Sequence, residues 1–322
     1  DRRKPGQSKF TTKRNESDTA QILSGVFEGK TTGTPISVIV YNQDQRSRDY
    51  GKIKDCYRPG HADYTFDAKY GIRDYRGGGR SSARETIGRV AAGAIAKKIL
   101  KQLGIDLITF TRSIGDICIP ETEYHYEDIA ENMLYMPNND YAKKASDYLE
   151  SCMKNQDSSG GIVECRVKGM PVGIGETVFD KLDASLAKAV VSIGAVKGVE
   201  IGDGFEASKN HGSNNNDAFT CQNGSVIKKT NHAGGILGGM SDGSELILRA
   251  AFKPTPSISK EQQTINTALE ETTIAITGRH DPVVVPRAVV VVESMAAITI
   301  LDQMMINMSA KMDALEAFYC KE

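Results

Sequence analysis

The sequence predicts a globular protein with a mixed α and β fold, and three observations carry this prediction. Hydrophobic residues form 39 % and charged residues 25 % of the 322 residues, a composition that supports a sizeable core. Helix-like and strand-like patterns alternate irregularly along the chain. A Gly- and Thr-rich connection joins two β-rich runs near the N-terminus, which is typical of antiparallel strands. The length fits one large domain or two closely associated ones.

The first elements follow from local patterns. Two β-rich runs at residues 22–27 and 36–41 predict a hairpin. A helix is expected over residues 85–103, because apolar residues recur at helical spacing and lysines gather in the last turns. Gly104 follows it where a C-cap glycine belongs. A strand is expected next, over residues 105–111.

Later elements are predicted in the same way. The patterns favour a helix over residues 141–153, a strand over 161–167 and a short Ala-rich helix over 183–191. Near the C-terminus we expect a Val-rich strand from residue 283 and then a helix over 294–308, whose methionines we interpret as core packing.

Composition also limits the partners. Pro286, Arg287 and Glu293 interrupt the longest near-apolar stretch, residues 283–300, and a bilayer would tolerate them poorly, so we expect no membrane association. Forty Lys and Arg against forty-one Asp and Glu give a net charge of −1. No overall field therefore favours nucleic acid, and any anion site must be local.

The cysteines predict the compartment. They are scattered without CxxC or Cys/His spacing, which argues against zinc sites and disulfide scaffolds and fits a reducing cytoplasm. The six positions are Cys56, Cys118, Cys152, Cys165, Cys221 and Cys320.

The first residues look like mid-chain sequence. The chain starts at Asp1 rather than Met, and residues 1–6 lack the apolar segment of a signal peptide. We expect that an N-terminal part of the protein precedes this sequence.

A first glycine cluster predicts an anion site. Residues 77–79 are three glycines, and Arg80, Ser81 and Ser82 follow them directly before the expected helix. Free backbone N–H groups, a guanidinium and a helix N-terminus together form a cradle for phosphate or carboxylate. The alternative is a tight turn in which Ser81 or Ser82 caps the helix. No P-loop and no dinucleotide fingerprint is present, so ATP hydrolysis is not expected.

Three other segments are candidates for chemistry. His61 lies among Arg, Gly and Tyr residues, and we interpret it as a proton donor. Lys253–Ser257 is a rigid basic segment whose side chains suit a phosphate, although an edge-strand exit explains its prolines nearly as well. Residues 279–282, Arg-His-Asp-Pro, form either a site or a structural turn. The second glycine cluster, residues 231–240, allows close backbone approach to a ligand but is a weak signal alone.

Together these stretches resemble the chorismate synthase family, over residues 1 to about 303. Six segments look like family signatures in family order: residues 58–65, 73–85, 196–205, 231–239, 252–257 and 278–288. The resemblance implies a single α+β domain over 1–322, a β-α-β sandwich whose helices pack between two mainly antiparallel sheets. It also implies a homotetramer in the cytoplasm.

The activity that the resemblance implies is that of a lyase. Such an enzyme converts 5-enolpyruvylshikimate 3-phosphate to chorismate and phosphate by anti-1,4-elimination, the last common step of the shikimate pathway to aromatic amino acids. It uses reduced FMN without net redox change. We expect an external flavin reductase, NADPH acting only indirectly through that reductase, and no metal.

By family analogy, individual residues take roles. His61 protonates or stabilises the reduced flavin, and Asp281 with Ser82 helps to relay the substrate hydrogen. The substrate's anionic groups would be bound by Arg3, Lys9, Arg58, Arg84 and Arg279. The cofactor would contact Arg80, Ser81, Ser82, Gly194, Ala195, Gly238, Lys253, Pro254, Thr255, Pro256, Ser257 and Arg279.

Two departures from the family pattern are visible. Relatives commonly have Gln or Asn where this chain has Gly194, so a side-chain hydrogen bond to the flavin would be absent or replaced by water. The family also opens with a strand and a Gly-Glu-Ser-His-Gly motif that this sequence lacks, which is why we expect a few tens of preceding residues.

Three alternatives remain open at this point. A different flavin-dependent oxidoreductase, acting on a phosphorylated or carboxylated small molecule, would use the same loops and oxidise flavin stoichiometrically. An RNA-binding module would use the Arg, Tyr and Gly residues of 50–84, but the near-zero net charge weakens it. A structural assembly protein would bind neither flavin nor substrate.

Overall fold

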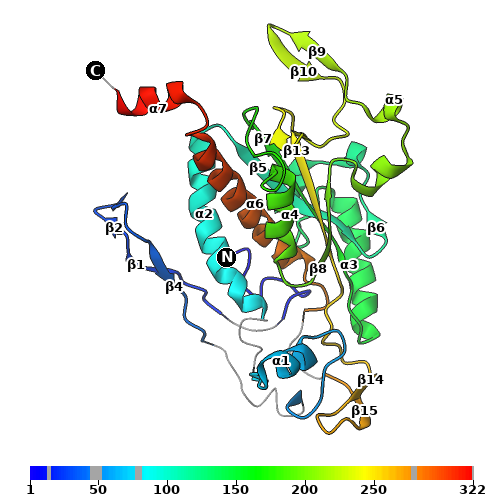
Figure 1. Ribbon diagram of the computed structural model, residues 1–322. Helices are drawn as coiled ribbons and strands as arrows, with labels where there is room; N and C mark the ends of the chain where they lie inside the picture. Colours follow the sequence, from blue (N-terminus) through cyan, green and yellow to red (C-terminus); the bar gives the residue numbers. More distant parts are fainter. Residues whose placement is uncertain (13–15, 44–52, 77–81, 277–280, 321–322) are drawn as a thin grey trace. The chain divides into compact units, whose positions relative to one another are not determined.

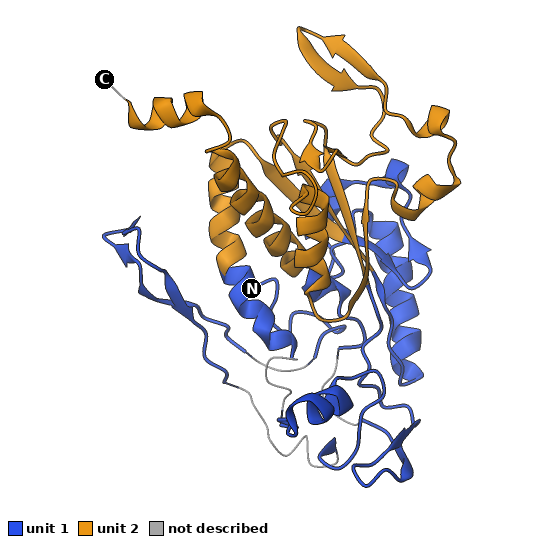
Figure 2. Ribbon diagram, viewed as in Figure 1, with its two compact units in different colours: residues 1–91, 111–161, 252–288 blue, residues 92–110, 162–251, 289–322 orange. Residues whose placement is uncertain are grey.

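The structure is a computed structural model, and it describes residues 1–12, 16–43, 53–76, 82–276 and 281–320 (Figure 1). The chain forms two compact units, each built from three separate stretches (Figure 2). Unit 1 comprises residues 1–91, 111–161 and 252–288, and unit 2 comprises residues 92–110, 162–251 and 289–322.

Unit 1 begins with the predicted hairpin. β1 (Gln21–Ser24) pairs antiparallel with β4 (Ser37–Ile39). At the tip, β2 (Val26–Phe27) pairs with β3 (Lys30–Thr31) in the same sense. The two β-rich runs are therefore joined as the sequence predicts.

The other elements of unit 1 are short apart from one helix. They are α1 (Asp63–Tyr70), η3 (Ala83–Glu85), β6 (Ile117–Cys118), η4 (Glu121–Glu123), η5 (Tyr126–Ala130), α3 (Asn139–Lys154), β14 (Gln262–Ile265) and β15 (Glu271–Ile274). The core of this unit includes Ile114, Ile119, Leu134, Met136 and Leu149, all at most 1 % exposed. The α1 helix contributes little to this hydrophobic core, because its buried residue is the charged Asp63.

Most strands of a five-stranded sheet belong to unit 2, in the order β6-β5-β7-β13-β8. β5 (Asp106–Ile114) begins in unit 2 and ends in unit 1, where it pairs antiparallel with β6. The remaining strands are β7 (Gly161–Lys168), β13 (Leu246–Phe252) and β8 (Val196–Ile201). The β5, β7 and β13 strands are largely buried, and the charged residues buried among them, Glu164, Arg166 and Arg249, form ion pairs.

Helices and short hairpins complete unit 2. They are most of α2 (Thr86–Gln102) and α6 (Val285–Asn307), with α4 (Leu182–Val191), η6 (Gly204–Lys209), α5 (Gly212–Asn215), α7 (Met312–Tyr319), β9 (Phe219–Gln222), β10 (Ser225–Lys228), β11 (Ile236–Leu237) and β12 (Met240–Ser241). Gly104 ends α2 in a left-handed conformation at φ 78°, so the predicted C-cap is confirmed. The expected helices at 141–153 and 183–191 and the strand at 161–167 are present within a few residues of the predicted bounds.

The Val-rich strand predicted from residue 283 is wrong, because α6 already begins at Val285. Pro286 fits there since the first turn of a helix needs no backbone donor. Val289, Val291 and Val292 are at most 3 % exposed, and their burial outweighs the intrinsic β preference of branched side chains. Among the described residues, α6 is the one helix whose length and apolar composition would allow it to cross a membrane, yet half of its most apolar window is buried inside the protein.

Candidate active site

The loop before α1 carries the predicted proton donor. Gly60 has a φ of 66°, a left-handed conformation that favours glycine, and the His61 N–H donates to the Arg58 carbonyl at 3.2 Å. This turn leads directly into α1, whose first residue is Asp63. The sequence thus places the imidazole and a carboxylate two residues apart around a helix start.

The imidazole of His61 lies between opposite charges. Its Nδ1 is 3.0 Å from Asp63 Oδ1 and 3.0 Å from an Arg58 terminal nitrogen. Arg58 also donates to both oxygens of Asp63 at 2.7 Å, through Nε and the same terminal nitrogen. Burial acts to raise the pKa of the Asp63 carboxyl, but hydrogen bonds from Arg58 and His61 outweigh it and hold the pKa far below its ordinary value. Asp63 is therefore an ionised carboxylate.

The predicted cofactor segment lies against this loop. Lys253 Nζ donates to the Gly60 carbonyl, and Pro256 Cβ would be 3.3 Å from a Cβ at position 60. Ser158 Oγ donates to the Thr255 carbonyl at 2.7 Å, which fixes the segment from its other side. The Thr255 hydroxyl is buried and has no hydrogen-bond partner among the described residues. Lys253–Ser257 and His61 are thus brought together within unit 1.

Two predicted substrate arginines meet at one carboxylate. Arg3 donates to Asp18 Oδ2 at 2.5 Å, and Arg84 approaches Asp18 Oδ1 at 3.4 Å. Burial lowers the pKa of Arg3, Asp18 opposes this, and the neighbouring charges of Arg287 and Arg84 lower it further. Ser82 is the N-cap of η3, where its Oγ accepts the Arg84 N–H at 3.2 Å. The capping role left open by the sequence is therefore present, and Ser82 still has a hydroxyl hydrogen to donate.

Asp281 is held in place by two donors. The Thr12 N–H donates to Oδ1 at 2.6 Å, and Arg287 donates to Oδ2 at 2.5 Å. Arg287 also donates to the Arg3 carbonyl at 2.9 Å. Arg287 therefore ties Asp281 to the segment that carries Arg3, a role that its charge alone does not predict.

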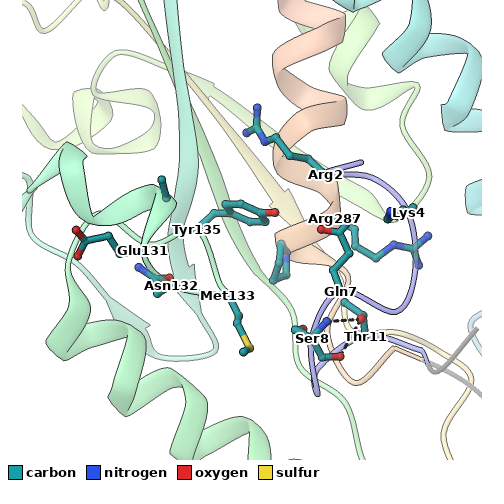
Figure 3. A pocket seen from close by; sticks show the side chains of 12 residues that line it. Arg2, Lys4, Gln7, Ser8, Thr11, Glu131, Asn132, Met133, Tyr135 and Arg287 are labelled. Atoms are coloured by element: carbon teal, nitrogen blue, oxygen red, sulfur yellow. Dashed lines mark hydrogen bonds between the residues drawn. The ribbon is translucent and has the colours of Figure 1, made fainter. Parts of the chain in front are cut away.

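A pocket of about 240 Å³ opens in unit 1 beside these residues (Figure 3). Arg2, Lys4 and Arg287 contribute cationic groups to its wall, and the Arg2 guanidinium carbon lies 5.6 Å from the centre of the Tyr135 ring. The rest of the wall is formed by Gln7, Ser8, Thr11, Ala130, Glu131, Asn132, Met133 and Pro286. We expected none of these residues at the site, although Arg2 and Lys4 flank the predicted Arg3.

Other predicted residues are placed elsewhere or not described. The Lys9 side chain is 57 % exposed and pairs with Glu150 on α3 at 2.5 Å. Glu150 is not one of the predicted site residues. Arg80, Ser81 and Arg279, with His280, lie outside the described residues.

Gly194, Ala195 and Gly238 belong to unit 2 and are considered there alone. Gly194 and Gly238 are exposed, and a Cβ at either position would have no atom within 4 Å. Ala195 and Gly238 have left-handed backbones with φ 74° and 61°. Open backbone of this kind can be approached closely by a flat or charged ligand.

The contacts in unit 1 favour one kind of chemistry. A histidine that can carry a proton, a basic Lys-Pro-Thr-Pro-Ser segment and buried arginines are suited to an anionic ligand and to proton transfer. Among the described residues, no group of three or more His, Cys, Asp and Glu side chains could hold a metal ion.

The comparisons with known proteins concern the chain as a whole. The family model for chorismate synthase matches residues 1–305. A chorismate synthase of Agathobacter rectalis is 63 % identical over 99 % of this chain and 87 % of its own, and one of Lachnoclostridium phytofermentans is 63 % identical over 99 % and 88 %. One of Methanosarcina mazei is 53 % identical over 95 % of this chain and 84 % of its own.

A solved structure confirms the fold. A crystal structure of chorismate synthase superimposes with a TM-score of 0.71 at 30 % identity, covering 92 % of this chain and 82 % of that one. The predicted α+β fold and the family resemblance are thereby confirmed. With the family match over nearly its full length, the chain belongs to the chorismate synthase family.

Proposed function

We propose that the protein is a lyase that converts 5-enolpyruvylshikimate 3-phosphate to chorismate and phosphate by anti-1,4-elimination, with reduced FMN as its cofactor. The observation that carries the proposal is the contact of Lys253 with the His61 loop. It joins a basic segment suited to the cofactor with a group suited to donate a proton. The family membership supports the same reaction.

The residues present fit a flavin with a phosphate. The Thr255 hydroxyl is buried without a hydrogen-bond partner among the residues that the structure describes, and such a group costs free energy unless a ligand or water satisfies it. Gly194 and Gly238 leave open space at two backbone positions. We infer that Lys253–Ser257, Gly194, Ala195 and Gly238 bind the cofactor, together with Arg80, Ser81, Ser82 and Arg279. Reduced FMN, when bound, supplies an electron-rich ring beside the substrate.

We assign the arginines of unit 1 to the substrate's phosphate and carboxylates. Arg3 and Arg84 share Asp18, and a guanidinium suits these anions through its paired donors. In Arg58, Nε and one terminal nitrogen already bond Asp63, so this residue binds substrate only through donors that remain. Lys9 and Arg279 complete the proposed set.

The proton-handling groups are His61, Asp281 and Ser82. In this proposal His61 protonates or stabilises the reduced flavin. Asp281, oriented by Thr12 and Arg287, helps with Ser82 to relay the substrate hydrogen. We further propose a cytoplasmic homotetramer that is supplied by an external flavin reductase, with NADPH acting only through that reductase, and with no nucleic acid or membrane partner.

Replacing His61 tests the proposal. His61→Ala is expected to lower kcat by about 10²–10⁴-fold, because general acid catalysis is lost, while FMN binding persists. His211→Ala is the control, since this exposed histidine makes no side-chain capping bond on α5. Chorismate formation should be followed anaerobically with chemically reduced FMN. Equal rates in the two variants would remove His61 from the mechanism, and one flavin oxidised per product would favour an oxidoreductase.

A further inference from the structure

The contacts of His61 draw attention to its neighbour Asp63. The charged groups around the imidazole, among the described residues, are Arg58 and Asp63 in direct contact, Arg73 beyond Asp63, and Lys253 on the Gly60 carbonyl. Asp63 is the one carboxylate in contact with the ring in this set. Its backbone belongs to the first turn of α1, so the helix fixes its place.

Asp63 is itself fixed more firmly than capping or solubility requires. It is 5 % exposed and accepts the Arg58 backbone N–H at 3.1 Å as well as two bonds from the Arg58 side chain. Arg73 approaches its Oδ2 at 3.4 Å, and Arg73 in turn is 3.3 Å from Asp67 Oδ2. A carboxylate held from three sides is suited to orient a neighbouring ring.

The geometry offers Nδ1 a partner in either protonation state. A bare Nδ1 accepts from Arg58, and an Nδ1 that carries hydrogen donates to Asp63. The bond from an Nδ1–H to the ionised Asp63 carboxylate is charge-assisted, which favours hydrogen on Nδ1. Engagement of Nδ1 leaves Nε2 as the nitrogen that can give up a proton.

We propose that Asp63 is a positioning residue for this reaction: it holds the Nδ1–H of the protonated His61 ring, so that the proton leaves from Nε2 and the ring remains as the neutral Nδ1–H tautomer. The assignment rests on the proposed role of His61. Asp63 touches neither substrate nor cofactor in this account. It acts through the imidazole alone.

The test compares Asp63→Asn with Asp67→Asn. Both variants remove a carboxylate from α1 that faces Arg73, but no contact joins Asp67 to His61 in the described structure. The readout is the ¹⁵N spectrum of imidazole-labelled enzyme, recorded for the neutral ring, where the two tautomers are distinguishable. The sequence has five histidines, and the His61 signal is identified by its loss in His61→Ala.

The expected result is an Nδ1–H tautomer in the parent and in Asp67→Asn. Asp63→Asn should shift the signal to the Nε2–H tautomer, because Arg58 then donates to a bare Nδ1. The kcat of Asp63→Asn should fall about 10²-fold with KM within about twofold, while Asp67→Asn keeps the parental kcat. A parental Nε2–H tautomer overturns the proposal, and this measurement needs no variant of Asp63 to fold.

Other outcomes are equally decisive. A tautomer that Asp63→Asn leaves unchanged overturns the positioning role, and so does a changed tautomer with an unchanged kcat. Full activity of His61→Ala would instead overturn the proposed function of His61. The tautomer spectra would then still decide whether Asp63 orients the ring, so the two failures are distinguishable.

Discussion

Asp217 shows how one side chain holds a loop. Its carboxylate accepts the backbone N–H groups of His232 and Ala233 at 2.8 and 3.0 Å, together with Thr230 Oγ1 and Lys228 Nζ. Burial acts to raise the pKa of Asp217, but these four donors hold the pKa well below its usual range. Asp217 therefore anchors the glycine cluster that carries Gly238, within unit 2.

The lowered pKa of Asp217 predicts how the free energy of unfolding depends on pH. A carboxyl with a depressed folded-state pKa adds stability above its unfolded pKa of about 4 and loses it as the pH falls toward the folded value. Asp217→Asn should lower the free energy of unfolding by about 1–3 kcal/mol at pH 7, and the difference from the parent should shrink below about pH 4. Urea unfolding at several pH values measures this, with the exposed Asp180→Asn as control. A difference that stays constant down to pH 2.5 would contradict it.

Cys165 gives a second prediction for a single side chain. It is fully buried on β7, and burial raises the pKa of its thiol to about 11. Because the thiolate is the reactive form, Cys165 should resist alkylation by iodoacetamide at pH 8 in the folded protein and react fully in denaturant. Peptide mass spectrometry measures the extent of Cys165 alkylation under both conditions. Labelling of native Cys165 as fast as the exposed Cys118 would show that this part of the sheet opens.

Candidate site residues can be selected from the sequence where a residue type has a recognisable motif around it. His61 and Lys253–Ser257 were singled out, and the structure brings them together. Asp63 and Arg287 were missed as partners because their importance lies in the atoms that they contact. Sequence spacing gives no sign that Arg287 bonds both Asp281 and the Arg3 carbonyl.

At the scale of elements, α2 and α6 approach each other closely in unit 2. A Cβ at Gly93 would lie 2.2 Å from Ser294 Cβ, so only glycine fits there. Lys97 of α2 also donates to Glu293 of α6, which is 3 % exposed. The small residue and the ion pair fix the register of the two helices.

Two glycines of α2 make a matched pair for testing this packing. Gly93→Ala should destabilise the protein by about 1–3 kcal/mol, since the added methyl group has no space. Gly88→Ala, where a Cβ meets no atom within 4 Å, should stabilise it by about 0.5–1 kcal/mol through helix propensity. Thermal or urea unfolding compares them. Equal effects of the two substitutions would contradict the close approach.

Element prediction was good where periodicity and caps agree. The helix ending at Gly104 and the N-terminal hairpin were predicted from local signals alone. The strand prediction for the valines after residue 283 was wrong. β-Branched residues favour strands by intrinsic propensity, but these valines lie in a buried helix that packs in the core. Tertiary burial cannot be seen in a local window.

At the scale of the whole molecule, the two units share continuous elements. α2, α6 and β5 each run from one unit into the other, and each unit consists of three separate stretches. The single-domain expectation predicts that both units unfold in one cooperative transition. Near-ultraviolet circular dichroism and Tyr fluorescence should then give coincident urea curves. Two separated transitions would contradict a single domain.

The reaction itself is the central claim, and anaerobic turnover of 5-enolpyruvylshikimate 3-phosphate with chemically reduced FMN tests it most directly. The account predicts chorismate and phosphate in equal amounts, with the flavin still reduced after many turnovers. It also predicts that His61→Ala abolishes most of this turnover while His211→Ala does not. Folded enzyme that binds FMN and forms no chorismate, or that oxidises one flavin for each product, would contradict the proposed lyase.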